Sequence, residues 1–301
     1  GENAIDIKGE ISINHVIVSQ NKMYGYRAPL AGNSDGSAIA AHSCSDAGPD
    51  CGNAWILYNE CFDSERCIQV TGNNNVRVIG NIVHDNTVGP GYGIRLRSSN
   101  VGYVLHNIVY NSKECYRGEV TVEVHFINNI GINCSVSHAV SQRSGSTAAN
   151  NIWFQQGGVV NTSLNGGCSN CIVADPRFIS YPSNLHYQLG SPAIEGGIAD
   201  LVAHNAVFQS IHGPSVSILF DYDKNVRPQG SAYDIGAYEF VSGTPQTLLG
   251  DLNGDRTVNG FDWTIMEGQW NTSNAQSDLN SDGVVNSIDF SLMNQNWGRS
   301  T

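Results

Sequence analysis

The chain is poor in charged residues, and especially in basic ones. Charged side chains make up 14% of its 301 residues, against about 25% in an ordinary soluble domain. Lys and Arg together number only 15, so the long Glu- and Lys-rich stretches of coiled coils and helical bundles are missing. No run of about 18 apolar residues occurs, which excludes a membrane-spanning helix. The formal net charge of −12 argues against nucleic acid as a partner.

The length fits one large domain, or one large domain with a small one. The sequence starts at Gly1 with no charged and apolar leader before it. We therefore expect that processing has removed a leader or that the chain is a fragment.

The cysteines are even in number and several are close neighbours, which favours disulfides and an oxidising, extracellular setting. A zinc site is the alternative, but only Cys168-x-x-Cys171 has a suitable spacing and no second pair completes it. The pairs that we predict are Cys44–Cys51, Cys61–Cys67, Cys115–Cys134 and Cys168–Cys171.

Residues 1–180 contain an internal repeat that ends on asparagine. The repeated asparagines are Asn59, Asn81, Asn107, Asn129 and Asn151, at spacings of 22, 26, 22 and 22 residues. The segments around them are short, rich in β-branched residues and broken by Gly, Asn and Ser, which predicts strands. A period of about 22 residues with several short strands is typical of one coil of a parallel β-solenoid.

The recurrent asparagine has two interpretations. Its amide can donate to one neighbouring coil and accept from the other, which would form a ladder that satisfies buried backbone groups. Alternatively, asparagine is an ordinary turn residue. The fixed position in successive coils favours the ladder.

Position in the repeat also predicts which side chains face inward. Residues five and three before each asparagine are mostly apolar or small, as at Val76, Val78, Val124 and Phe126, and should form the core. The residue four before should point outward, where a polysaccharide or only solvent would meet it. That row is Trp55, Arg77, Tyr103, His125 and Thr147, and a second row four residues after the asparagines is Asp63, Asp85, Asn111, Asn133 and Gln155.

This region resembles the right-handed parallel β-helix, or pectin-lyase-like, superfamily. Three motifs sharpen the likeness: Cys171 to Phe178, His186 to Ile194, and Asp221 to Glu239 with its Arg227-Pro228 and Asp234-Ile-Gly-Ala-Tyr-Glu. They resemble the closing segments of secreted bacterial β-helix proteins of the choice-of-anchor type. The resemblance implies an all-β right-handed parallel β-helix over residues 1–240, ending in final coils and an end cap that blocks the exposed strand edge.

A small polar linker over residues 241–249 leads to two similar acidic stretches, each followed by an apolar-periodic helix. Both stretches carry oxygen side chains at loop positions 1, 3, 5, 9 and 12, and position 7 can offer its carbonyl. This is the ligand spacing of a calcium loop. The ligands predicted for the first loop are Asp251, Asn253, Asp255, Thr257, Asn259 and Asp262; those for the second are Asp278, Asn280, Asp282, Val284, Asn286 and Asp289.

Two such loop–helix units, 27 residues apart, strongly resemble a dockerin, a small α-helical, EF-hand-like domain that we place at residues 250–301. The resemblance implies folding on two calcium ions, an extracellular location and docking onto a cohesin module. In this family the residues after loop position 9 often recognise the partner. Here they are Gly260-Phe261 and Ser287-Ile288 in place of the familiar Ser-Thr pair, which points to an unusual partner or to self-association.

The sequence leaves open whether the protein is an enzyme. Polysaccharide lyases use a base, usually Lys or Arg, and glycoside hydrolases use two carboxylates at a defined separation. The catalytic candidates are Asp85, Arg97 and Glu119, and we expect Arg97 and Glu119 to be neighbours because each lies ten residues before a ladder asparagine. A surface salt bridge is the alternative for this pair, and no family catalytic motif is matched.

Three functions remain for the whole chain: an assembly module that joins partners or forms a multimer or fibre through its dockerin, a lyase or hydrolase carried on a dockerin, and a non-catalytic glycan-binding protein. A fibre would follow if the open strands of the first coil pair with a neighbouring molecule.

Overall fold

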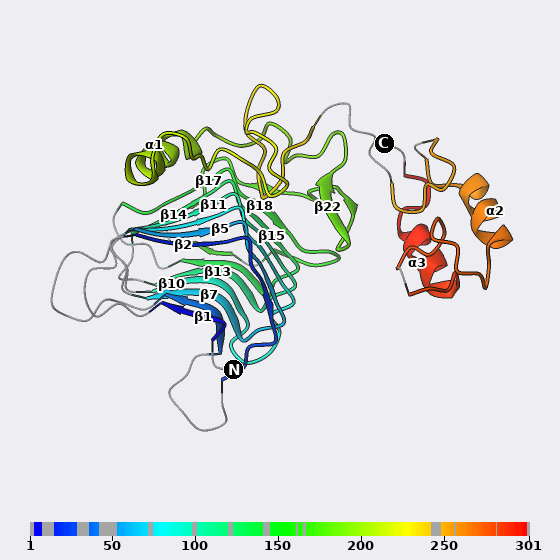
Figure 1. The fold of residues 1–301 in the computed structure, drawn as a ribbon, viewed down its shortest axis with the longest axis horizontal. Helices are drawn as coiled ribbons and strands as arrows, with labels where there is room; N and C mark the ends of the chain where they lie inside the picture. Colours follow the sequence, from blue (N-terminus) through cyan, green and yellow to red (C-terminus); the bar gives the residue numbers. More distant parts are fainter. Residues whose placement is uncertain are drawn as a thin grey trace. The chain divides into compact units, whose positions relative to one another are not determined.

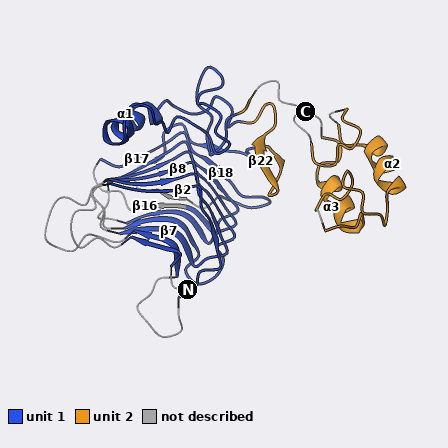
Figure 2. Cartoon of the chain, viewed as in Figure 1, with its two compact units in different colours: residues 1–176, 192–239 blue, residues 177–191, 240–301 orange. Residues whose placement is uncertain are grey.

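The computed structural model (Figure 1) describes residues 3–7, 15–28, 36–41, 53–71, 75–97, 101–119, 123–140, 145–160, 162–164, 167–241, 248–255, 257–280 and 282–299. The chain divides into two compact units (Figure 2). The first comprises Gly1–Pro176 and Pro192–Glu239, and the second comprises Arg177–Ser191 and Phe240–Thr301.

The described part of the first unit is built from three parallel sheets. Sheet A has the order β1 (Ile5–Ile7), β4 (Ser37–Ala41), β7 (Arg66–Thr71), β10 (Tyr92–Arg97), β13 (Glu114–Gly118), β16 (Val136–Val140) and β19 (Thr162–Leu164). Sheet B has the order β17 (Thr147–Ala149), β14 (Glu123–Ile127), β11 (Val101–Leu105), β8 (Asn75–Ile79), β5 (Asn53–Leu57) and β2 (His15–Ser19). Sheet C has the order β20 (Ile172–Val173), β18 (Ile152–Phe154), β15 (Ile130–Ile132), β12 (Ile108–Tyr110), β9 (Ile82–His84), β6 (Glu60–Phe62) and β3 (Lys22–Tyr24).

The chain visits sheets A, B and C in turn and then returns to sheet A, so that each coil adds one strand to every sheet, except that the last described coil adds none to sheet B. Strands of successive coils pair in parallel without slippage: Val76 lies beside Ala54 on one side and beside Gly102 on the other. The predicted parallel β-helix is confirmed. Its core is the space between the sheets, where the predicted inward residues Val76, Val78, Val124 and Phe126 are buried.

The asparagine ladder runs through six coils, at the turn between sheets B and C. In each step the backbone N–H and the side-chain Nδ2 of one asparagine donate to Oδ1 of the next; for Asn81 and Asn107 these distances are 2.9 and 3.0 Å. Nδ2 also donates to a backbone carbonyl of the preceding coil, such as that of Ile56 for Asn81. The ladder comprises Asn21, Asn59, Asn81, Asn107, Asn129 and Asn151.

The residue before each ladder asparagine adopts the left-handed conformation, with φ between 51° and 66°. At five of the six positions this residue is not glycine, as at His106 and Asn128, although a side chain there costs about 1 kcal/mol. At the remaining position, Gly80, a Cβ would lie 2.6 Å from the ring of Tyr58 in the preceding coil. The left-handed conformation of this turn therefore depends on the stacking of neighbouring coils more than on the residue at the position.

A second turn follows each strand of sheet C. Asp63, Asp85, Asn111 and Asn133 occupy its left-handed position, with φ between 47° and 56°. Asp and Asn tolerate this conformation better than other residues with a side chain. The second row predicted from the repeat is thus explained at these four positions by turn geometry.

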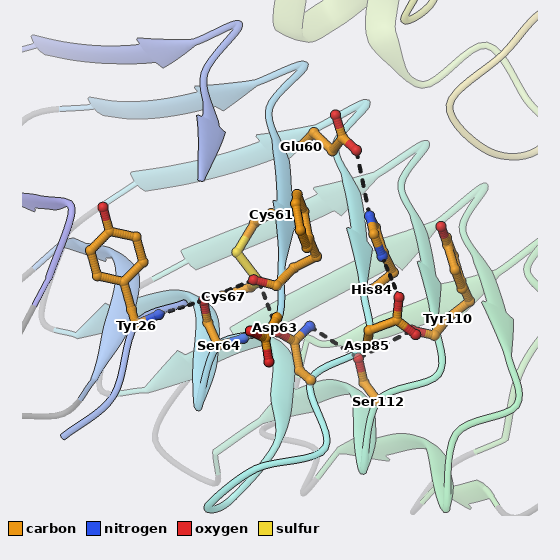
Figure 3. Close-up of a disulfide and its surroundings, with 12 residues drawn as sticks. Tyr26, Glu60, Cys61, Asp63, Ser64, Cys67, His84, Asp85, Tyr110 and Ser112 are labelled. Atoms are coloured by element: carbon orange, nitrogen blue, oxygen red, sulfur yellow. Dashed lines mark hydrogen bonds and ion pairs between the residues drawn. A yellow bond between two sulfur atoms is a disulfide. The ribbon is translucent and has the colours of Figure 1, made fainter. Parts of the chain in front are cut away.

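Disulfides reinforce the core of the first unit. Cys61–Cys67 and Cys115–Cys134 lie inside it, and Figure 3 shows the first of them. Cys168–Cys171 lies at the end of the asparagine ladder, where the backbone N–H of Asn151 points to Sγ of Cys171 at 3.4 Å. These are the pairs favoured by their spacing in the sequence. The fourth predicted pair, Cys44–Cys51, lies outside the described residues.

Residues 192–239 lie along the outer face of sheet B. Helix α1 (Leu201–His212) packs Leu201 and Phe208 against Trp55, Ile79 and other residues of that face. The closing motifs were expected to form an end cap; α1, which lies between two of them, covers a side of the solenoid instead. The reason is that the outward residues of sheet B are largely apolar and need a cover.

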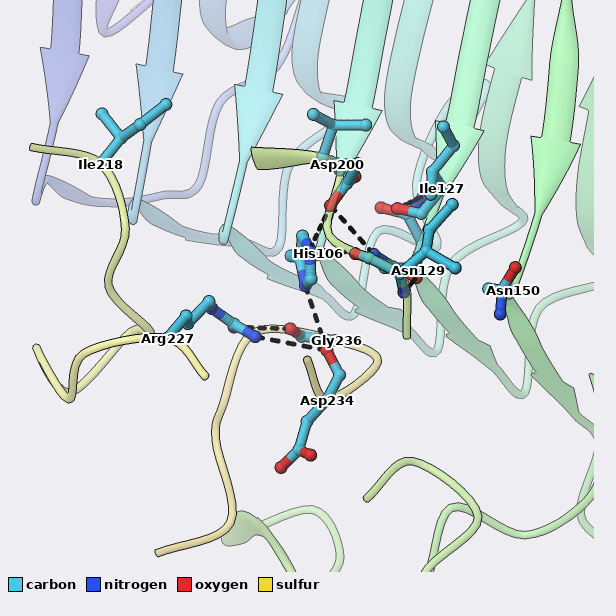
Figure 4. Close-up of polar contacts among 12 residues, drawn as sticks. His106, Ile127, Asn129, Asn150, Asp200, Ile218, Arg227, Asp234 and Gly236 are labelled. Carbon is cyan, nitrogen blue, oxygen red and sulfur yellow. Dashed lines mark hydrogen bonds and ion pairs between the residues drawn. The ribbon is translucent and has the colours of Figure 1, made fainter. Parts of the chain in front are cut away.

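Two buried side chains, His106 and Arg227, hold this segment through hydrogen bonds (Figure 4). His106 bonds to the carboxylate of Asp200 at 2.9 Å and to the carbonyl of Asp234 at 3.1 Å. Further along, the fully buried Arg227 donates to Glu239 at 2.6 Å and to the carbonyl of Gly236 at 2.8 Å. The Arg-Pro and Asp-Ile-Gly-Ala-Tyr-Glu motifs thus form one internal clamp.

The second unit contains the hairpin β21 (Phe178–Ser180) and β22 (Asn184–Tyr187), and helices α2 (Gly260–Gly268) and α3 (Ser287–Gln295). Its apolar cluster includes Val258, Met266, Val285 and Met293, so the two loop–helix repeats share one core. Residues 177–191 group with this unit, whereas we had placed them in the β-helix domain of residues 1–240.

Candidate functional site

The first acidic loop of the second unit gathers three carboxylates. Oxygen atoms of Asp251, Asp255 and Asp262 lie within 4.8 Å of one another. Asp262 is fully buried, and its carboxylate accepts hydrogen bonds from the backbone N–H groups of Leu252 at 2.8 Å and Asn259 at 2.9 Å. These bonds fold the loop back on itself, so that its oxygen atoms converge.

The same residues start helix α2. The side chain of Asn259 accepts a hydrogen bond from the backbone N–H of Phe261 at 2.8 Å, and Asp262 completes a capping box. Nδ2 of Asn259 also donates to the carbonyl of Thr257 at 3.3 Å. Loop positions 7, 9 and 12 are therefore coupled to the helix N-terminus.

The second loop repeats this arrangement. Asp289 is fully buried and accepts hydrogen bonds from the backbone N–H groups of Leu279 at 2.7 Å and Asn286 at 2.8 Å. Asn286 and Asp289 form the capping box of α3. Hydrogen bonds from the side chain of Asn280 and from the backbone lower the pKa of Asp282, so this carboxylate stays charged in weak acid.

The predicted ligands fit a hard cation. The described side chains of both loops offer carboxylate and amide oxygen atoms, which calcium prefers, and no sulfur or nitrogen ligand is among them. Gly254 and Gly283, with φ of 75° and 93°, permit the sharp loop turns at positions 4 and 6. Residue 256, where the usual glycine is replaced, lies outside the described residues.

The predicted recognition residues are accessible. Phe261 is 73% exposed and Ile288 is 53% exposed, at the second position of α2 and α3. Both side chains are large and apolar, and they occupy equivalent positions of the two repeats.

The residues of the predicted glycan-binding row of sheet B are neighbours in the predicted order, but part of the row is buried. Trp55 pairs with Arg77, Arg77 with Tyr103, and Tyr103 with His125 in register. Trp55 is 0% exposed and Arg77 is 6% exposed, because α1 lies over them. The expectation of an exposed row is wrong at these two positions. The covering segment lies more than 120 residues further along the chain, so the repeat alone gave no sign of it.

Sheet A carries a charged row instead. Glu119 accepts hydrogen bonds from Arg95 at 2.8 Å and from Arg117 at 3.2 Å, and Arg117 also bonds to Glu114 at 2.9 Å. The guanidinium groups of Arg95 and Arg117 lie over the ring of Tyr92, 4.7 and 5.4 Å from its centre. We call these five residues the sheet A row.

The candidate Glu119 therefore belongs to a cluster, but its partners there are Arg95 and Arg117 and not the expected Arg97. The strand register continues from Leu96 beside Gly118, as predicted, yet the side chain of Glu119 turns to Arg95. Arg97, at the end of β10, is exposed. Because Arg95 and Arg97 are two residues apart on β10, they share one face of the strand, and Glu119 bonds to the Arg95 side chain of that face at 2.8 Å.

The candidate Asp85 lies on the outer side of sheet C, as part of a second cluster (Figure 3). Its carboxylate lies 2.8 Å from Nδ1 of His84, and Nε2 of His84 lies 3.5 Å from Glu60. The ring of His84 is stacked between those of Phe62 and Tyr110, at 4.8 Å from each. Sequence reasoning missed this aromatic row, although residues three after the ladder asparagines would have revealed it.

Comparison with known proteins gives two findings. Residues 249–297 match the family model of the Dockerin type I domain. Among solved structures, the crystal structure of the pectate lyase Pel9A is similar, with a TM-score of 0.53 and 13% sequence identity over 79% of this chain and 62% of that chain. At this identity the likeness shows the fold alone, and this chain spans less than two thirds of the lyase. No curated protein matches the chain.

Among the described residues, no helix has the length and apolar character needed to cross a membrane.

Proposed function

We propose that this parallel β-helix, which carries a C-terminal dockerin type I domain, is an extracellular component that assembles onto a cohesin-bearing partner. The observation that carries the proposal is the pair of oxygen-lined loops, each joined to its helix by a capping box made of its own ligands. Each loop holds one calcium ion, through the six residues predicted for it. The β-helix is the body that this assembly displays.

Phe261 and Ile288 form the contact with the partner. Each follows loop position 9, so calcium binding and the placement of these side chains depend on the same turn. Both are apolar, whereas the familiar Ser-Thr pair is polar. The partner should therefore present an apolar patch, and a second copy of this chain is the alternative partner.

Replacing both contact residues should abolish docking. We expect the variant Phe261→Asp/Ile288→Asp to bind a cohesin module at least 100-fold more weakly than the wild type, since each change buries a charge in an apolar contact. Isothermal titration of the full chain with a panel of cohesin modules, with and without calcium, measures this.

The matched control is Val202→Asp, which places the same charge at an apolar residue of the β-helix that is 54% exposed. It should bind as the wild type does. Equal binding by the double variant would contradict the assigned contact. Calcium-dependent growth in particle mass by light scattering, with no cohesin bound, would identify the second copy as the partner.

A second candidate function is favoured by the sheet A row: binding of a polysaccharide by the β-helix. Burial alone would raise the pKa of Glu119, but hydrogen bonds and charge from Arg95 and Arg117 lower it below its usual value. A carboxylate held in this way is not a proton donor near neutral pH. The hydrogen bond that Arg117 donates to Glu114 raises the pKa of Arg117, which therefore stays protonated and is no base. The row suits the recognition of sugar hydroxyls better than hydrolysis or elimination.

The substitution Glu119→Gln tests this second function. It removes the charge that orders Arg95 and Arg117, so we expect about tenfold weaker retention on the polysaccharide that binds best, measured by affinity electrophoresis across a panel. The control Glu60→Gln removes a carboxylate from sheet C, where it pairs with Lys22. If the wild type releases reducing sugars or unsaturated products and Glu119→Gln does not, the protein is instead an enzyme that uses Glu119.

A further inference from the structure

Helix α1 rests on sheet B through a histidine that must be uncharged. Nε of Arg77 donates a hydrogen bond to Nδ1 of His204 at 3.1 Å. Because a guanidinium only donates, Nδ1 of His204 must carry a lone pair and no proton. Protonation at Nδ1 would remove this bond and place an imidazolium against a guanidinium.

The surroundings of His204 offer little to balance a second positive charge. Arg77 approaches from β8, Tyr103 from β11 with its ring centre 4.4 Å away, and His125 lies beyond Tyr103 on β14. Asp200, at the start of α1, already bonds to His106 at 2.9 Å. Among the described residues, Arg77 donates hydrogen bonds to His204 and to the amide oxygen of Asn53, both of them uncharged acceptors.

The other end of α1 repeats the pattern. His212 lies in its last turn and faces His15 of β2, with ring centres 6.1 Å apart. Nε2 of His212 is buried without a hydrogen-bond partner, and its ring packs on Phe208 at 4.6 Å. Two histidines of one helix therefore each face a basic side chain on sheet B, His204 facing Arg77 and His212 facing His15.

We propose that α1 is an acid-released cover: in mild acid His204 and His212 gain protons, and the helix detaches from sheet B while the solenoid stays folded. The ladder that holds the coils together consists of asparagine amides and backbone groups, which do not titrate in this range. Detachment exposes the apolar face that contains Trp55, Leu57 and Ile79.

The direction of the pH dependence follows from the pKa values of His204 and His212 when α1 is packed on sheet B. Burial, and then Arg77, lower the pKa of His204 to about 4, and burial with His15 lowers that of His212. In the detached helix both rings titrate near the ordinary value of about 6.5. The open state thus binds more protons, so the closed state is favoured above that value and is lost as the pH falls towards 4. For His204 alone, opening should rise about 20-fold between pH 7 and pH 5.

Hydrogen exchange of the full chain tests the proposal. Amides of residues 201–212 should exchange about 20-fold faster at pH 5 than at pH 7, after correction for the intrinsic pH dependence of exchange. Amides of β8 and β11 should keep their protection. The same α1 protection at both pH values would overturn the proposal, as would joint loss of protection by α1 and these strands.

The variant His204→Gln/His212→Gln is the matched test, because the Gln side chain can still accept from Arg77 and does not titrate. Its α1 exchange should be the same at both pH values, whereas His186→Gln, in the hairpin of the second unit, should respond as the wild type does. A full acid response in the double variant would overturn the proposal. If α1 of the double variant is already detached at pH 7, the single variant His212→Gln is the test. Its α1 amides should still exchange faster at pH 5 than at pH 7, because His204 is retained, and the absence of this response would overturn the proposal.

Discussion

Chelation of calcium is expected to unfold the dockerin domain and to leave the β-helix intact. An ion present at 100 times its dissociation constant stabilises the folded form by about 2.7 kcal/mol, so two such ions contribute about 5 kcal/mol. A small domain has a total stability of this order. In excess chelator, circular dichroism should show loss of the helical signal of α2 and α3, and the fluorescence of Trp263 and Trp270 should shift to that of exposed indole.

The physical reason lies in the buried carboxylates. Asp262 and Asp289 are fully buried, and in the first loop two more carboxylates lie within 4.8 Å. Without a cation, the partly exposed Asp251 and the exposed Asp255 repel the buried carboxylate of Asp262, which water screens poorly. The hydrogen bonds that these carboxylates accept from backbone N–H groups are what bends each loop, so the loops and the two helix N-termini should fail together.

Single variants distinguish the loss of calcium binding from the loss of the capping box of helix α2. Asp255→Ala removes a first-loop carboxylate that is exposed and takes no part in the capping box of α2. We expect it to lower calcium affinity at least tenfold, by titration calorimetry, and to keep the fold at high calcium. Glu267→Ala, an exposed acid on α2, is the control and should bind as the wild type does. Unchanged helical signal of the wild type in chelator would contradict the metal's structural role.

Most of the solenoid could be predicted from the sequence, because similar coils produce a repeated pattern of residues. Each coil meets the same neighbours, so the ladder asparagines and the inward Val76 and Phe126 recur at fixed spacing. The two acidic loops of the dockerin domain were equally visible, since their residues are local in sequence. Both are cases in which contacts depend on short or constant separations.

What the sequence could not predict depends on contacts between distant segments. Nothing in the repeat shows that Leu201 and Phe208 cover Trp55, because the pairing joins an apolar helix to an apolar row with no fixed spacing. The partner of Glu119 was also missed, since Arg95 and Arg97 share one face of β10 and the alternation of the strand does not distinguish them.

Replacing a central ladder asparagine should destabilise the β-helix far more than replacing a terminal one. Nδ2 of Asn107 donates to the carbonyls of Val78 and Leu105 and to Asn129, and its Oδ1 accepts from Asn81. The variant Asn107→Ala leaves several buried groups without partners, each costing about 1–3 kcal/mol. Because such losses are not additive, we expect about 4 kcal/mol in the free energy of unfolding, measured with urea in the presence of calcium.

Asn21→Ala is the matched comparison, and the contrast decides between the two interpretations of the repeat. Asn21 and Asn107 follow residues with nearly the same left-handed backbone, Gln20 at φ 59° and His106 at φ 54°. If asparagine served only the turn, the two variants would lose similar stability. In the ladder, Asn21 has a described asparagine partner on one side only, and its bond to the carbonyl of Ser19 is exposed, so its loss should cost about 1 kcal/mol. Equal losses would mean that the ladder bonds contribute little beyond the turn itself; a difference of about 3 kcal/mol would show that the coils are held together through the amides.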